Sequence, residues 1–300
     1  MPDPGPEGRR PSGEAARSAG TLATGPAVRP SSREVEHSAS RPAPDPLATP
    51  TRIAFAGDWH ANTRWATAAV GYAADHGAGV MVHLGDFGYE FRPAFLRGLD
   101  RALANANLTL LFVDGNHEAF PTLLRYPVRP NGLRQVTDRV WHLPRGFRWN
   151  WGGVRFLALG GAYSVDRQWR TPGSSWWLEE EITDEQVAIA SAGGPVDVLL
   201  SHDCPAGVEI PGLTESAHLW PPLDLIRAEG HRRQLDRVTA AVRPRWVWHG
   251  HYHRRYDATA DLGYGPVKVR GLDCDATLLE SNVVVTDLDE LHSHAVTTPD

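Results

Sequence analysis

Three things are scarce in this 300-residue sequence: cysteine, long apolar runs and positive charge. Two cysteines, Cys204 and Cys274, are too few for a disulfide framework and fit a reducing cytosol better than secretion. No apolar run approaches the roughly 18 residues of a membrane span, and Arg9 and Arg10 are not followed by the apolar segment of a signal peptide. We therefore expect a cytoplasmic protein without a membrane partner. The formal net charge of −6 also predicts no stable nucleic-acid partner.

Residues 1–50 contain no aromatic side chain and are rich in Pro, Gly, Ala, Ser and Arg. Such a segment buries too little apolar surface to offset the conformational entropy lost on ordering, so we expect a disordered tail. Hydrophobic residues make up 41% of the whole sequence, which is ample material for a core in the remainder. We predict one domain over residues 51–291 and a short C-terminal tail over residues 292–300.

Short apolar runs alternate with helix signals in the first half of this domain. Strands are predicted over Ile53–Ala56, Val80–Leu84 and Leu108–Val113, with helices beginning near Asn62 and at Pro93 between them. This alternation favours parallel strands joined by right-handed crossovers.

Beyond about residue 140 the apolar runs are shorter and are separated by turns. We expect a helix capped by Thr183 and Gln186 and another around Arg232–Val242. The further strands are predicted over Val154–Leu159, Val196–Leu200, Trp246–Trp248 and an antiparallel meander of Val267–Arg270, Ala276–Leu279 and Val283–Thr286. The fold class is α/β, with two layers of strands and helices outside them.

Polar residues suited to metal binding follow five of these strands at the point where each one ends. Because open α/β sheets bind ligands at the carboxyl ends of their strands, we expect these side chains to meet. They are Asp58, His60, Asp86, Asn116, His117, His202, His249 and His251. Singly, each has a simpler interpretation, since a histidine beside a strand is usually a core or surface residue and Asp58 or Asp86 could cap a helix. The simpler interpretations do not explain why every candidate donor follows an apolar strand.

At least seven oxygen and imidazole donors exceed the four of a closed structural metal site. Two ions that share one carboxylate fit this number better, and Asp86, alone at its turn, is the natural bridge. Two ions at roughly 3.5–4 Å from each other clamp the attacking and leaving oxygens of a phosphoryl displacement. The donor set therefore favours phosphoryl chemistry.

Five blocks of the sequence resemble, in order and approximate spacing, the motif blocks of the calcineurin-like metallophosphoesterases over residues 52–287. The blocks are Gly57-Asp58-Trp59-His60, Gly85-Asp86, Gly115-Asn116-His117-Glu118, Ser201-His202 and His249-Gly250-His251. The resemblance implies a two-sheet β-sandwich flanked by helices, the four-layer αββα metallophosphoesterase fold. It also implies two ligand sets, one of Asp58, His60, Asp86 and His251 and the other of Asp86, Asn116, His202 and His249. By the same resemblance, His117 protonates the leaving group.

The second block departs from the protein Ser/Thr phosphatase branch of this family. That branch has an Asp and an Arg after Gly-Asp, where this sequence has Phe87-Gly88-Tyr89-Glu90. The phosphate-clamping Arg and the Asp partner of the catalytic His are therefore not at their expected places, which argues against a protein phosphatase. Glu90 is a candidate to orient His117.

Three residues outside the blocks are candidates for substrate contact. Arg167 and Trp169 lie in an irregular stretch that is either a substrate lid, since Arg binds phosphate and Trp stacks on bases, or a hydrophobic plug of the sandwich. Arg254 either reaches a phosphate or lies on a solvated basic strand edge. Cys204, with no base assigned to it, is interpreted as a small buried residue.

The sequence thus predicts a hydrolase, a metal-dependent phosphatase or phosphodiesterase in which a metal-bridging hydroxide attacks phosphorus and His117 is the general acid. The expected cofactors are two divalent metal ions, Mn, Fe or Zn, and the expected substrate is a phosphate ester, nucleotides included. Two alternatives stay open: a phosphodiesterase or nuclease acting on nucleotides or nucleic acid, and a non-catalytic metal-binding scaffold. The complete donor set argues against the scaffold, which has no chemical need of it.

Overall fold

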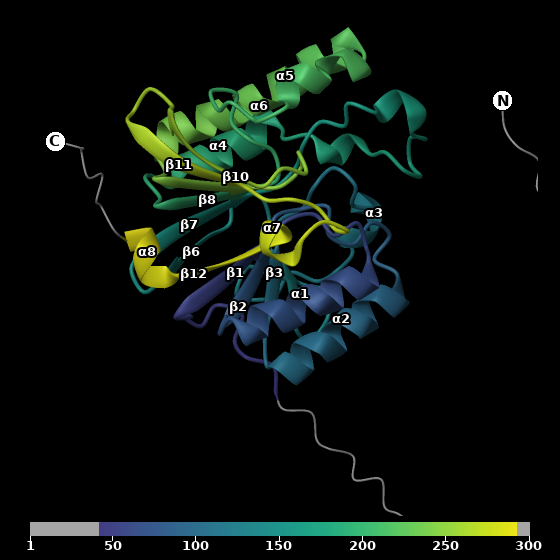
Figure 1. Cartoon of the computed structure of the whole chain (residues 1–300), viewed down its shortest axis with the longest axis vertical. Coiled ribbons are helices and arrows are strands. Elements are labelled where there is room, and N and C mark those ends of the chain that lie inside the picture. The colour runs from purple at the N-terminus through teal and green to yellow at the C-terminus, as the bar shows by residue number, and fades with distance from the viewer. Residues whose placement is uncertain (1–41, 293–300) are drawn as a thin grey trace, which may run out of the picture. The chain divides into compact units, whose positions relative to one another are not determined.

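A computed structural model describes residues 42–292 (Figure 1). Most of the predicted N-terminal tail (residues 1–41) and nearly all of the predicted C-terminal tail (residues 293–300) lie outside this range. Residues 42–50 pack against the domain: Pro46 and Pro50 are buried, and the Leu47 carbonyl accepts a hydrogen bond from Trp151 Nε1 at 3.1 Å. The ordered domain therefore begins earlier than the predicted Thr51.

Two six-stranded sheets form the centre of the described residues. The first sheet has the strand order β12-β1-β2-β3-β5-β4 and consists of β1 Arg52–Ala56, β2 Val80–His83, β3 Leu110–Phe112, β4 Arg134–Gln135, β5 Val140–His142 and β12 Val283–Asp287. The second has the order β10-β11-β9-β8-β7-β6 and consists of β6 Arg148–Trp151, β7 Val154–Leu159, β8 Val198–Ser201, β9 Trp246–His249, β10 Tyr256–Asp261 and β11 Pro266–Gly271. In each sheet the inner strands pair in parallel and the two edge strands pair antiparallel.

Helices cover the outer face of each sheet. The first sheet packs against α1 Thr63–Asp75 and α2 Pro93–Ala106, and the second against α4 Asp184–Ala192 and α6 Pro222–Val242 (Figure 1). The shorter helical elements are α3 Phe120–Leu123, α5 Leu213–Ser216, α7 Leu279–Asn282, α8 Leu288–His292 and the 3₁₀ turns η1 Arg167–Trp169, η2 Leu178–Glu180 and η3 Ala217–Leu219. This four-layer α-β-β-α arrangement confirms the predicted fold class.

Local sequence signals explain where the longer helices begin. The Asn62 side chain caps α1 by accepting a hydrogen bond from the Trp65 amide, and Thr183 and Gln186 form a reciprocal capping box on α4. Helix α6 begins ten residues before the predicted Arg232, because Pro222 occupies the first helical position, where a missing N–H costs nothing.

The predicted C-terminal meander is wrong. Strand β11 pairs in parallel with β9 and antiparallel with β10, whereas β12 joins the other sheet beside β1. Residues 276–278 form no strand, and Leu279 begins α7. An apolar pattern shows that a strand is half-buried, but it does not show which of two sheets supplies its neighbour.

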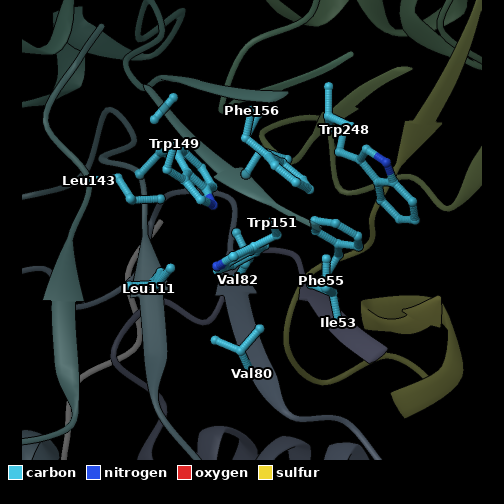
Figure 2. Packing of buried hydrophobic residues seen from close by; sticks show 14 of the residues in the cluster. Ile53, Phe55, Val80, Val82, Leu111, Leu143, Trp149, Trp151, Phe156 and Trp248 are labelled. Atoms are coloured by element: carbon cyan, nitrogen blue, oxygen red, sulfur yellow. The ribbon is translucent and has the colours of Figure 1, made fainter. Parts of the chain in front are cut away.

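Aromatic side chains fill the space between the two sheets. Phe55 of β1 stacks on Trp248 of β9 at 4.1 Å between ring centroids, and Trp149 of β6 stacks on Phe156 of β7 at 5.1 Å (Figure 2). Strand β1 also buries its opposite face, since Ala54 packs in the cluster beneath α1 and α2. Burial on both faces explains why β1 reads as a continuous apolar run.

We expect Phe55→Ala to lower the free energy of unfolding by about 3–5 kcal/mol, because it removes a fully buried ring and leaves a cavity against Trp248. Ile226→Ala is the matched control, since Ile226 is 69% exposed on α6. Urea unfolding followed by circular dichroism measures both changes. Similar losses in the two variants would show that the stacked pair does not hold the sheets together.

Candidate metal centre

The carboxyl ends of the parallel strands from both sheets meet at one edge of the sandwich. Asp58 follows β1, Asp86 follows β2 and Asn116 follows β3, while His202 and His251 follow β8 and β9 of the second sheet. All except His251 are buried. This is the common edge that the sequence pattern predicts.

Two glycines allow the two carboxylates to lie against backbone. A Cβ atom on Gly250 would overlap Asp58 Oδ1, and one on Gly115 would overlap Asp86 Oδ1. This close contact between carboxylate and backbone allows N–H groups to bind the carboxylate: His251 N donates to Asp58 Oδ1 at 3.1 Å. Gly250 and Gly115 are therefore each required by the carboxylate of another motif block.

Several donors lie on strained backbone. His60, Asp86, His251 and His253 have φ of 47°, 55°, 67° and 51°, in the left-handed region that non-glycine residues seldom occupy. Strain of this kind clusters at functional sites, where surrounding structure holds side chains in a required direction. The tight turns place these rings and carboxylates over the strand ends.

One group of donors gathers around Asp58. His253 Nε2 lies 3.1 Å from Asp58 Oδ2, and His60 Nε2 lies 3.9 Å from Asp58 Oδ2 and 3.7 Å from Asp86 Oδ2. The other ring nitrogen of His60, Nδ1, contacts Asp275 Oδ1 at 2.8 Å. Asp275 thereby turns the Nε2 of His60 toward the two carboxylates, as supporting residues do at metal sites.

A second group gathers around Asp86. His202 Nε2 lies 3.4 Å from Asp86 Oδ1 and 3.0 Å from Asn116 Oδ1, while His202 Nδ1 donates to the Leu84 carbonyl at 2.7 Å. Because that carbonyl accepts only, the proton lies on Nδ1 and Nε2 faces the cluster. Asn116 Nδ2 donates to Ser164 Oγ at 3.0 Å, which directs the amide oxygen toward His202.

The electrostatics of these groups favour bound positive charge. Burial lowers the pKa of the His202 imidazole, but Asp86 and Asp58 outweigh it and raise that pKa to about 10. Burial likewise raises the pKa of Asp86, yet His117 and His202 hold it well below its usual range. Buried carboxylates need such compensation. Two donor triads, Asp58-His60-His253 and Asp58-Asp86-His202, each place one atom per residue within 4.8 Å of the others, so the donor set fits divalent cations.

His249 does not join either group. Its Nε2 lies 2.7 Å from the Tyr256 hydroxyl and its Nδ1 lies 2.9 Å from the Gly250 carbonyl. The pleat of β9 explains this direction: Trp248 faces the other sheet, whereas Val247 and His249 point toward the helix side. The structure therefore does not support the predicted ligand role of His249 and brings His253 to the cluster instead.

His117 lies at the edge of the cluster with an unexpected partner. Its Nε2 is 3.7 Å from Asp86 Oδ2 and accepts a hydrogen bond from Arg170 Nη2 at 2.6 Å. Glu90, the predicted orienting residue, instead pairs with Arg92 at 2.9 Å on the surface. Burial lowers the pKa of His117, Asp86 raises it, and Arg170 lowers it further, with a net decrease. The side chain that hydrogen-bonds to the ring of His117 is thus the cation Arg170, not the predicted Glu90.

A cavity of about 600 Å³ opens beside the donors. One end is formed by Asp86, Asn116 and His117, and Arg170 lines it as well. The far wall comes from α5, η3 and the first turns of α6 and is largely apolar; it includes Leu213, Leu219, Trp220 and Leu225. The cavity can therefore receive a polar group at the donors and an apolar group beyond them.

The three predicted substrate contacts have different positions. Arg254 lines the cavity, with its guanidinium against Gly212. Arg167 lies over the Trp176 ring at 4.4 Å from the centroid and is absent from the cavity lining. Trp169 is 64% exposed, is likewise absent from the lining, and pairs with Trp220 at 6.0 Å between ring centroids. The loop residue that does reach the donors is Arg170.

Comparison with family models shows which family this chain belongs to. The model of the calcineurin-like phosphoesterases matches residues 51–255, which is more than half of the chain. The chain belongs to the calcineurin-like phosphoesterase family. The matched region contains the residues of both donor groups except Asp275.

Individual relatives share little sequence identity with this chain. The lariat debranching enzyme of Schizosaccharomyces pombe is 27% identical over 166 residues, which are 51% of this chain and 35% of that enzyme. The chain thus spans about a third of the length of this curated relative. Among solved structures, a dimetal phosphatase from Danio rerio is 15% identical with a TM-score of 0.49, over 81% of this chain and 93% of that one. A protein from Thermus thermophilus is 16% identical with a TM-score of 0.43, over 80% of this chain and 99% of that one.

In this calcineurin-like phosphoesterase, the sequence pattern misses supporting residues more often than donors. His253 was detectable, since it continues the alternation of His249 and His251 just past the end of β9. Asp275 and Ser164 were not, because they come from loops far along the chain and carry no motif of their own.

Among the described residues, no helix has the length and apolar character needed to cross a membrane.

Metal content distinguishes His253 from His249. We expect His253→Ala to weaken the binding of one ion by more than the roughly 10–100-fold typical of a supporting residue, because His253 faces Asp58. His249→Gln should retain metal and lower the melting temperature, since it disturbs a buried bond to Tyr256. Elemental analysis after dialysis against graded metal concentrations measures both. Metal loss confined to His249→Gln would return His249 to the ligand set.

Proposed function

We propose that this calcineurin-like phosphoesterase hydrolyses phosphate esters with a pair of divalent metal ions at the shared strand ends. The observation that carries this proposal is a cluster of donors in which Asp86 Oδ2 lies 3.7 Å from His60 Nε2 and Asp86 Oδ1 lies 3.4 Å from His202 Nε2, with Asp86 and His253 lining a cavity. A single closed site uses about four ligands, and this cluster offers more. Carboxylate, amide and imidazole donors without thiolate suit Mn, Fe or Zn.

The geometry supports a division of ligands between two ions. One ion would be held by Asp58, His60, Asp86 and His253, and the other by Asp86, Asn116, His202 and His251. His251 belongs with the second set because its ring lies 5.0 Å from that of His202. When bound, such a pair polarises a phosphoryl group and lowers the pKa of a water molecule. Asp86 lies next to both sets and would be the carboxylate shared by the two ions.

His117 supplies a proton to the leaving oxygen in this proposal. Its backbone N–H donates to Asp86 Oδ1 at 2.9 Å, which fixes its position beside the bridge without making its ring a ligand. Its Nε2 faces the end of the cavity where Asp86 and Asn116 lie. A group ester-linked at the donors would therefore have its leaving oxygen near this nitrogen.

A second candidate function is hydrolysis of phosphodiesters in nucleotides or nucleic acid. The observation that favours it is the 27% identity to the lariat debranching enzyme of Schizosaccharomyces pombe. Trp220 in the cavity wall could stack on a base. A matched pair of substrates, a nitrophenyl monoester and the corresponding methyl nitrophenyl diester, assayed with Mn²⁺, separates the two candidates. If the metal-loaded protein turned over neither substrate, the non-catalytic metal-binding scaffold would be the alternative that remains.

Asp86→Asn tests the shared bridge. Because Asp86 touches both donor groups, losing its charge should reduce metal content from about two ions per chain to less than one and abolish turnover. His60→Ala, the comparison variant, should affect mainly one ion, since His60 lies in one group. Elemental analysis and ester hydrolysis before and after chelation give the result. Normal metal content in Asp86→Asn would contradict the bridge.

His117→Ala tests the proton donor. An alkyl ester needs a proton on its departing oxygen, so its hydrolysis should slow by about 10²–10⁴. A nitrophenyl ester loses a stable anion and should slow much less, while metal content stays unchanged. Steady-state rates on both esters and elemental analysis provide the measurement. Equal losses on the two esters would indicate that His117 positions the substrate or holds metal instead.

A further inference from the structure

Arg170 is an unusually buried arginine beside the proposed reaction centre. It follows the 3₁₀ turn η1 in the long loop between β7 and α4, and only 8% of its side chain is exposed. Arginine is seldom buried to this degree unless its donors are paired. The partners of its guanidinium therefore need to be accounted for.

The guanidinium of Arg170 is only partly paired. Its Nη2 donates to His117 Nε2 at 2.6 Å and lies 2.8 Å from Asp166 Oδ1. Its Nη1 is buried and has no hydrogen-bond partner among the described residues. A buried donor without a partner costs free energy. An acceptor that arrives from the cavity would satisfy it.

An acceptor would reach Arg170 at the donor end of the cavity. Arg170 lines that end together with Asp86, Asn116 and His117. Of the other two arginines in the lining, Arg232 donates to the carbonyls of the loop after β8, and Arg254 is exposed against Gly212. Arg170 is thus the lining arginine whose guanidinium contacts the proposed proton donor His117 and keeps one donor, Nη1, without a partner.

We propose that Arg170 binds the phosphoryl group of the substrate, with Nη1 and Nη2 donating to two of its oxygens. This rests on the proposed function and names a residue that it leaves open. Arginine presents two parallel N–H donors in a fork that matches a phosphoryl edge. In taking the phosphoryl oxygen, Nη2 leaves the lone pair of His117 Nε2, which then takes up a proton from water and donates it to the leaving oxygen. Asp166 keeps the guanidinium in position throughout.

This assignment also explains a departure in the second motif block. Phe87-Gly88-Tyr89-Glu90 offers no arginine there, and Glu90 is engaged on the surface by Arg92. The cation beside His117 comes from a different part of the chain, the loop between β7 and α4. Substrate binding would therefore depend on how that loop packs.

Inhibition by inorganic phosphate tests the proposal with the full chain loaded with Mn²⁺. In Arg170→Gln we expect the inhibition constant of phosphate and the KM for a monoester to rise by about 10–100-fold, the usual loss for a hydrogen bond to a charged group. Metal content should be unchanged. Arg170→Lys should recover part of the loss, because it restores charge but not the fork. Arg167→Gln is the matched control, since Arg167 lies in the same loop but outside the cavity lining. The inhibition constant of phosphate for this variant should stay within about twofold of the wild-type value, the scatter expected of a substitution that does not line the site.

Each outcome decides the proposal. Phosphate inhibition that is unchanged in Arg170→Gln, or lost equally in Arg167→Gln, would overturn it. If the wild-type protein hydrolyses no ester with any metal, the proposed function fails, and calorimetric titration of phosphate into the metal-loaded protein still tests Arg170 alone. If Arg170→Gln does not fold, the same titration on Arg170→Lys and on Asp166→Asn replaces it, and wild-type affinity in both would overturn the proposal.

Discussion

Two buried carboxylates side by side are the constraint on which the rest of the site depends. Asp58 and Asp86 end neighbouring parallel strands, and both are almost completely removed from solvent. Like charges so close are tolerated only where donors and cations surround them. Backbone N–H groups of Asn116, His117 and His251 point at them, and the neighbouring glycines give these amides room to approach. These amides do not neutralise the negative charge of the two carboxylates. The charge that remains suits the site to divalent cations.

The direction of each donor is set by residues far away in the sequence. Asp275, in the loop between β11 and α7, orients His60, and the Ser164 hydroxyl orients Asn116 while donating to Glu180 at 2.7 Å. Burial raises the pKa of Glu180 to about 7, with the Ser164 bonds acting in the opposite direction. Such supporting contacts hold metal ligands in their rotamers. The loop that carries Ser164 also carries Arg170, so ligand orientation and the cation at the cavity come from one segment.

Much of the fold could be predicted because its local signals agree with its packing. Caps at Asn62 and Thr183 and the apolar face of α2 mark helices directly, and the central strands read as apolar runs. The edge strands could not be predicted in the same way. Strand β12 pairs with β1, more than 200 residues away, in a sheet other than that of β11. Pairing across such a distance depends on which backbone edge is open once the sheets have formed, and no local pattern records that.

The sequence by itself determined the family, through five motif blocks whose resemblance also implied the α/β sandwich. It likewise determined the strand ends at which Asp58, Asp86, Asn116 and His202 meet, because each of these residues follows a short apolar run. Only the tertiary structure decided which of the histidines at the end of β9 join these residues. His249 is still within the strand, so the pleat turns it toward Tyr256, whereas His253 lies beyond the strand and reaches Asp58. The tertiary structure also decided that His117 meets Arg170 and not Glu90. Both results depend on how separate segments fold onto one another. The spacing of His249, His251 and His253 makes each of them a candidate, but it does not show which of them face the carboxylates.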